Sequence, residues 1–267
     1  MNYKIIFLGD VCGEAGRKAV AKGIEILKDK YQPDFVIING ENSAGGFGIT
    51  PKIAEEFFSL GVDCITLGDH TFDRKEIIPY LEKEKKIIRP LNYPSGAPGK
   101  GIYITRKKNI LFIVINLIGR VFMKPVDCPF RRIEEELAKI NEKGIIIVDF
   151  HAEATAEKKA MGYFLDGKVS AVLGTHTHIP TADAKILPKG TAYISDVGMC
   201  GATNSILGMR IEDSLKRFLY GINYRLTPAD SASQIEGVLI EIDAPTYKAV
   251  RIERIWEENL NFDSMSF

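Results

Sequence analysis

Cysteine is scarce in this sequence, and neither sign of charge is in excess. The four cysteines, Cys12, Cys64, Cys128 and Cys200, are widely spaced and form no CxxC pair. This spacing argues against a disulfide framework or a zinc ribbon and suits a reducing cytosol. Lysine plus arginine and aspartate plus glutamate number 35 each, so the formal net charge is zero. A bulk electrostatic attraction to nucleic acid or to a membrane is therefore not expected.

Long hydrophobic runs are also lacking. No run approaches the ~20 apolar residues that a membrane-spanning helix needs. The first apolar run, residues 4–8, stops at Gly9 and Asp10 and is too short for a signal peptide. We therefore expect a cytoplasmic protein. The 267 residues show no internal repeat and no convincing boundary, so we expect a single domain over residues 1–267.

What the sequence does contain is a series of short apolar runs that alternate with helical patterns. This alternation predicts an α/β fold with βαβ units and a largely parallel core. Two β-hairpins are also expected, one over residues 102–116 and one over residues 236–255. The predicted strands that matter most cover residues 4–8, 34–38, 63–67, 145–150 and 169–173, and the predicted helices cover residues 16–27, 50–60, 73–81, 131–141, 155–162 and 210–220. Residues 174–178 and 196–201 are expected to be loops.

Histidine is rare, and its positions are informative. The only four are His70, His151, His176 and His178, and each follows an apolar, strand-like run. In open α/β sheets, ligands bind in the crevice outside the carboxyl ends of the strands. If the chain stays extended past residue 173, His176 and His178 point to the same side and can bind one metal ion. Alone, that pair is equally consistent with two histidines that cap a surface loop.

Acidic and amide side chains occupy the other predicted strand ends and complete a candidate metal site. They supply the hard oxygen donors that complement imidazole around a divalent ion, although Asp and Asn are also ordinary turn residues. Together with the histidines they exceed the needs of one four-coordinate metal, so a two-metal site with ions ~3.5–4 Å apart is the economical interpretation. These residues are Asp10, Glu41, Asn42 and Asp69.

Several ordered strings resemble a known family. The strand-end blocks resemble the signature of the calcineurin-like metallophosphoesterases. More narrowly, four strings resemble the YmdB-type 2′,3′-cyclic-nucleotide 2′-phosphodiesterases, and the resemblance runs from about residue 4 to residue 255. The strings are INGEN at residues 38–42, DFHAEAT at residues 149–155, GTHTH at residues 174–178 and LPKGTAYI at residues 187–194.

The resemblance implies a single-domain, four-layer αββα sandwich that holds two divalent or mixed-valence metal ions. The mixed nitrogen and oxygen ligands suit iron or manganese, with zinc or magnesium possible. His70 would be an unligated general acid that protonates the leaving oxygen while a metal-bridging hydroxide attacks phosphorus. By the same resemblance, the first ion would be held by Asp10, Glu41, Asn42 and His178, and the second by Glu41 as the bridge with Asp69, His151 and His176.

One residue departs from the superfamily pattern. The pattern is Gly-Asn-His, whereas this chain has Gly68, Asp69 and His70. Asp69 keeps an oxygen ligand, but it loses the N–H donor of an asparagine and adds negative charge near an anionic substrate. We therefore expect metal binding to survive, with phosphate affinity or turnover reduced.

These observations predict a metal-dependent phosphodiesterase that hydrolyses 2′,3′-cyclic nucleotides. The alternatives are a broader metallophosphatase acting on phosphomonoesters or 3′,5′-cyclic nucleotides, and a metal-bound regulatory protein with weak turnover. The expected partner is a small cyclic nucleotide or another phosphodiester rather than a membrane or a nucleic acid. Assembly into a homo-oligomer stays open.

Overall fold

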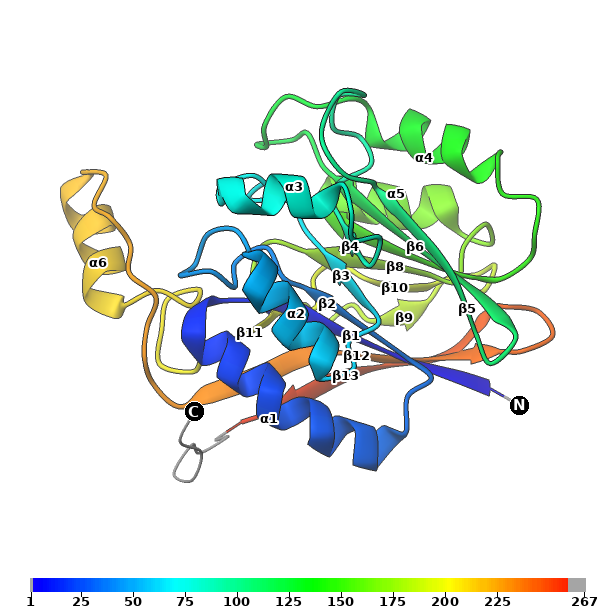
Figure 1. The fold of residues 1–267 in the computed structure, drawn as a ribbon, viewed down its shortest axis with the longest axis horizontal. Helices are drawn as coiled ribbons and strands as arrows, with labels where there is room; N and C mark the ends of the chain where they lie inside the picture. The colour runs from blue at the N-terminus through cyan, green and yellow to red at the C-terminus, as the bar shows by residue number, and fades with distance from the viewer. Residues whose placement is uncertain (1, 259–267) are drawn as a thin grey trace.

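Two β-sheets pack face to face, and helices cover the outer face of each sheet (Figure 1). This computed structural model describes residues 2–258, so the ends of the predicted domain, residue 1 and residues 259–267, lie outside the described part. The expected four-layer αββα sandwich is confirmed. Within residues 2–258, no helix is both long and apolar enough to cross a lipid bilayer.

The first sheet has seven strands and is mixed. Its central strands, β1 to β4 and β11, run parallel, and β12 and β13 add an antiparallel edge, which is the second predicted hairpin. In sheet order, the strands are β13 (Ala249–Glu257), β12 (Ser233–Asp243), β11 (Met199–Ala202), β1 (Asn2–Val11), β2 (Phe35–Asn39), β3 (Cys64–Thr66) and β4 (Ile87–Ile88).

The second sheet has six strands and carries the first predicted hairpin at its edge. The strands β6, β7, β8 and β10 run parallel, while β5 and β9 pair antiparallel at the two edges. In sheet order, they are β5 (Ile102–Lys107), β6 (Ile110–Ile118), β7 (Ile145–His151), β8 (Ala171–Thr175), β10 (Ala192–Ile194) and β9 (Lys185–Ile186).

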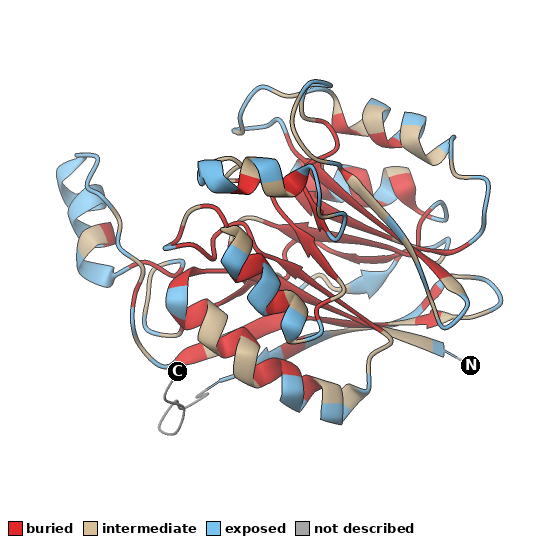
Figure 2. Ribbon diagram, viewed as in Figure 1, coloured by how far each residue is buried: buried red, intermediate tan, exposed pale blue. Residues whose placement is uncertain are grey.

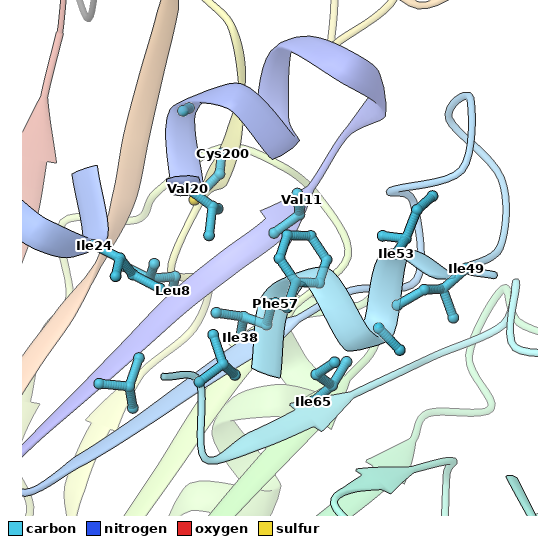
Figure 3. Close-up of a cluster of buried hydrophobic side chains, with 14 of the residues drawn as sticks. Leu8, Val11, Val20, Ile24, Ile38, Ile49, Ile53, Phe57, Ile65 and Cys200 are labelled. Carbon is cyan, nitrogen blue, oxygen red and sulfur yellow. The ribbon is translucent and has the colours of Figure 1, made fainter. Parts of the chain in front are cut away.

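Three apolar clusters correspond to the three boundaries between layers. One cluster joins the first sheet to the helices α1, α2 and α3, and Figure 3 shows part of it around Phe57. A second lies between the sheets, where Phe35 stacks on Phe112 with ring centroids 4.5 Å apart. The third joins the second sheet to α4 and α5. The helices are α1 (Gly13–Tyr31), α2 (Pro51–Ser59), α3 (Ile78–Leu81), α4 (Pro129–Leu137), α5 (Thr155–Leu165) and α6 (Ile211–Tyr220).

The start of α2 is set by local sequence. The hydroxyl of Thr50 accepts a hydrogen bond from the amide of Ile53, and Pro51 occupies the first turn of α2, where its missing N–H costs nothing. The last predicted helix is present as α6, which stands away from the sheets and is largely exposed (Figures 1 and 2).

Two local predictions were wrong. Residues 73–81 were expected to form one helix, but they form a short 3₁₀ turn, Lys75–Ile77, followed by α3. Pro79 has no N–H to donate back along the chain, so the α-helix starts only one residue before it. The expected loop 196–201 contains a strand, β11, because its residues pair in parallel with Asp10 and Val11 of β1.

Candidate metal centre

The predicted site residues lie at the carboxyl ends of strands from both sheets. They therefore meet in the crevice where a parallel α/β sheet binds its ligands. They are Asp10 in β1, Glu41 and Asn42 after β2, Asp69 and His70 after β3, His151 at the end of β7, and His176 and His178 after β8.

Four of these residues form a tight cluster. The ligand atoms of Glu41, Asp69, His151 and His176 all lie within 4.8 Å of one another. The Nε2 atom of His151 lies 2.9 Å from Glu41 Oε1, 3.2 Å from Asp69 Oδ1 and 3.0 Å from the Nδ1 atom of His176. Two carboxylates and two imidazoles that converge in this way can hold one metal ion.

A second group lies beside the first. The Nε2 atom of His178 lies 3.1 Å from Asn42 Nδ2 and 3.8 Å from Asp10 Oδ1. Asp10 is also adjacent to the first cluster, because its Oδ1 atom lies 3.9 Å from His151 Nδ1. The eight predicted residues thus separate into two adjoining groups, apart from His70.

The two histidines after β8 do not share one direction, because the chain does not stay extended. His176 and His178 adopt positive φ angles of 105° and 63°, which are unusual for residues other than glycine. The prediction from an extended chain was therefore wrong. This turn places His176 in the first group and His178 in the second.

The buried His151 is oriented by a hydrogen-bonded chain. Its Nδ1 atom lies 2.9 Å from the hydroxyl of Thr175, which donates its proton to Asp149 at 2.7 Å. Since that hydroxyl proton is committed to the carboxylate, Nδ1 donates to the hydroxyl oxygen, and Nε2 faces Glu41 and Asp69. A metal-ligating histidine is usually held in this way.

His176 and His178 are likewise each oriented through one ring nitrogen. The Nε2 atom of His176 lies 3.2 Å from a carboxylate oxygen of Glu153, so its Nδ1 atom is left facing the cluster. The Nδ1 atom of His178 donates to the main-chain oxygen of Leu207 at 3.1 Å, so its Nε2 atom faces Asp10. Each imidazole therefore directs its other ring nitrogen inward.

The inner carboxylates lack hydrogen bonds where an ion would sit. The Oδ1 atom of Asp10 and the Oε1 atom of Glu41 are buried and have no hydrogen-bond partner among the described residues. Burying an unpaired carboxylate oxygen is costly, and a bound cation removes that cost. Gly68 permits this crowding, since a Cβ there would lie 2.5 Å from Glu41 Oε2 and 2.4 Å from the ring of His151. The residues therefore fit a metal centre.

The titration of the cluster reflects burial and close charges. Burial, together with the neighbouring charge of His151, lowers the pKa of His176 to about 3. For His151 burial acts in the same direction, but the charge of Glu41 and the hydrogen bond to Asp69 prevail and raise its pKa well above the usual value. Burial raises the pKa of Asp69, but the hydrogen bond and charge of His151 outweigh it, and the net shift is downward. Asp69 is therefore ionised and can act as a ligand.

His70 stands apart from the metal-binding groups. Its Nδ1 atom lies 2.8 Å from Asp73 Oδ2, and its Nε2 atom lies 3.9 Å from Asp69 Oδ2. Phe47 packs against the imidazole edge-to-face, with ring centroids 5.1 Å apart. His70 is therefore oriented at the rim of the site, where it can exchange a proton.

Several residues that support the site were missed in the sequence. Asp149 lies within an apolar strand and Thr175 ends one, and a polar residue at such a position could have indicated a role in the site. Nothing local marks Lys158, which is buried in α5 and pairs with Asp196 at 2.7 Å. The carboxylate of Asp196 also accepts hydrogen bonds from the amide and hydroxyl of Thr177, which lies between the two histidines.

The chain is similar to known proteins over nearly its whole length. It is 48% identical over 265 residues, 99% of each protein, to the Bacillus subtilis (strain 168) protein named 2′,3′-cyclic-nucleotide 2′-phosphodiesterase. The crystal structure of a hypothetical protein from Thermus thermophilus has a TM-score of 0.90 and 40% identity, covering 96% of this chain and 99% of that one. The crystal structure of a novel phosphatase from Mycoplasma pneumoniae has a TM-score of 0.92 and 37% identity, covering 97% and 94%.

A family model described as YmdB-like protein matches residues 6–255. The matched span includes all of the residues that the two sheets bring together, from Asp10 to His178. The chain belongs to the YmdB-like protein family.

Proposed function

We propose that this protein is a dinuclear metal-dependent phosphodiesterase that hydrolyses 2′,3′-cyclic nucleotides. The observation that carries the proposal is that three imidazoles, each fixed through its outer nitrogen, direct their inner nitrogens toward buried carboxylates. The similarity to the Bacillus subtilis 2′,3′-cyclic-nucleotide 2′-phosphodiesterase supports the substrate class.

The proposed ligands follow the two observed groups. Asp10, Asn42 and His178 would hold one ion, and Asp69, His151 and His176 would hold the other, with Glu41 shared between them. Mixed nitrogen and oxygen ligands suit manganese or iron, with zinc or magnesium allowed. When bound, the ions would supply positive charge that activates a water molecule and stabilises the developing charge on the phosphoryl oxygens.

His70 would act as the general acid. Asp73 accepts a hydrogen bond from Nδ1 and orients the ring, so Nε2 faces the site and would present its proton to the substrate. In the net reaction, the phosphorus–O2′ bond breaks, water supplies the new oxygen on phosphorus, and His70 gives its proton to the leaving 2′ oxygen. The product would be the nucleoside 3′-monophosphate.

A broader phosphatase activity is the second candidate. It is favoured by the similarity to the Mycoplasma pneumoniae structure, which is described as a novel phosphatase. The metal-binding groups are compatible with both activities, because they would contact the phosphoryl group and not the base or ribose.

The test is hydrolysis of 2′,3′-cyclic AMP by protein loaded with Mn²⁺, with the products separated as 2′- and 3′-monophosphate. We expect metal-dependent release of the 3′-monophosphate and much slower turnover of 3′,5′-cyclic AMP and p-nitrophenyl phosphate. Faster turnover of the latter two would favour the broader phosphatase. No turnover of any substrate, in protein that holds two metal ions per chain, would favour the regulatory alternative.

A further inference from the structure

We propose that Lys124 is a phosphate-binding residue of this site and offsets the negative charge of Asp69. This inference rests on the proposed function, because it assumes a phosphodiester substrate. The Nζ atom of Lys124 donates a hydrogen bond to the main-chain oxygen of Asp69 at 2.7 Å. An ammonium group has three N–H donors, so two remain for an anion bound beside the cluster.

The ammonium charge of Lys124 is not neutralised by a carboxylate. Within residues 2–258, no carboxylate oxygen lies within 4.0 Å of its Nζ atom, and the side chain is exposed. By contrast, the nearby Lys158 is buried and already paired with Asp196. Lys124 is thus a cation at the rim of the site that is available to a ligand.

The segment that carries Lys124 is anchored beside the site at its first residues. The amide of Gly119 donates to the main-chain oxygen of His151 at 2.9 Å. The amides of Arg120 and Val121 donate to the carboxylate of Glu157, which is buried in α5. The start of the segment is therefore fixed to the strand that supplies His151 and to the helix behind it.

The far end of the segment is anchored through Asn92. The amide of Asp127 donates to the main-chain oxygen of Asn92 at 3.0 Å, and the side-chain nitrogen of Asn92 donates to the main-chain oxygens of Ile118 and Asp127. Asn92 is fully buried, so it links both ends of the segment from beneath. Because the segment is anchored at both ends, less conformational entropy is lost when Lys124 binds a ligand.

Asp69 adds negative charge at the edge of the metal-binding cluster, next to the main-chain oxygen that Lys124 contacts. The side chain of Asp69 offers oxygen acceptors only, so it gives a phosphate no hydrogen bond. The ammonium of Lys124 is hydrogen-bonded to the main-chain oxygen of Asp69. It can therefore supply the phosphate with the N–H donor that Asp69 lacks and with one compensating positive charge.

The experiment compares inorganic phosphate binding by Mn²⁺-loaded proteins, measured by calorimetry together with metal content. We expect Lys124→Met to weaken phosphate binding about 10-fold and to raise KM for the cyclic nucleotide by a similar factor, with metal content and kcat little changed. Lys124→Arg should retain most of the affinity. Lys143→Met is the matched control, because Lys143 is exposed just before β7, at the end opposite His151.

Phosphate affinity of Lys124→Met equal to that of Lys143→Met would overturn the proposal, as would loss of metal, since either result would leave Lys124 a structural role at most. In an Asp69→Asn background, whose amide can donate to phosphate, we expect Lys124→Met to weaken binding by a smaller factor. An equal loss of phosphate affinity in both backgrounds would contradict the proposal that Lys124 offsets the charge of Asp69. Wild-type protein that binds phosphate without hydrolysing cyclic nucleotides would contradict the proposed function alone, because the binding comparison does not require turnover.

Discussion

At the scale of single residues, the proposed roles of the histidines rest on what their two ring nitrogens contact. His151, His176 and His178 give one nitrogen to an outer acceptor and turn the other toward carboxylates. His70 donates a hydrogen bond from Nδ1 to Asp73 and lies outside the four-residue cluster. Residue type alone does not distinguish a ligand from an acid, and membership of the four-residue cluster separates only His151 and His176 from His70.

We expect His151→Ala to remove metal and activity together, because it deletes the nitrogen closest to both Glu41 and Asp69. His178→Ala should likewise reduce metal content, through the second group. The measurement is metal per chain by elemental analysis, alongside turnover of 2′,3′-cyclic AMP. A variant that keeps two ions per chain would contradict the ligand assignment of that histidine.

The expected result for His70→Ala is different. Metal content should stay at the wild-type level, while kcat should fall by ~10²–10⁴-fold, the usual contribution of a general acid. Asp73→Asn should give a smaller loss, because the imidazole is kept and only its partner is altered. Full activity in His70→Ala would exclude the acid role, and loss of metal would instead make His70 a ligand.

At the scale of structural elements, one buried ion pair connects a helix to the site. Lys158 of α5 pairs with Asp196, whose carboxylate also holds Thr177 between two of the histidines. Both charged side chains are about 1% exposed, so each depends on the other for compensation. The turn after β8 is thus stabilised by α5 and not only by its own sequence.

We expect Lys158→Met to destabilise the metal-free protein by about 3–5 kcal/mol, because it leaves the charge of Asp196 buried without a partner. Urea unfolding followed by circular dichroism gives the free energy of unfolding. The control is Arg106→Met, which breaks the exposed pair with Glu142 and should cost at most about 1 kcal/mol. Similar losses in the two variants would show that the buried pair has no special role.

The sequence was sufficient for elements that are determined by local pattern and insufficient for those determined by distant partners. Apolar runs and turn residues predicted the alternating strands and both hairpins. The single helix predicted over residues 73–81 does not form because Pro79 has no N–H to donate back along the chain. The strand β11 was not predicted because only its pairing with β1 makes it a strand. The separation of His176 from His178 depends on Asp196 and α5, which no local pattern around residue 177 reveals.

At the scale of the whole molecule, buried carboxyl groups make stability depend on pH. Burial raises the pKa of Glu236 on β12 to about 7. Between an unfolded pKa of about 4.3 and this folded value, the unfolded chain loses the proton while the folded chain keeps it. Stability therefore falls as pH rises through this window.

We expect Glu236→Gln to remove this fall in folding stability at higher pH. The Tm of the variant minus that of the wild type should increase from pH 5 to pH 8, because the glutamine cannot ionise while its oxygen can still accept from the amide of Met199. Thermal unfolding of the metal-free proteins at several pH values measures the difference. A difference that stays constant across this range would show that Glu236 is ionised in the folded protein throughout.

The candidate ligands come from both sheets, and they span the chain from Asp10 to His178. During synthesis, Asp10 leaves the ribosome long before His178, so a chain that ends before residue 178 lacks part of the proposed site. Metal binding would therefore follow the meeting of strands from the two sheets. An ion that joins the two sheets would also bind the folded state alone, and so would lower the fraction of molecules open to proteases.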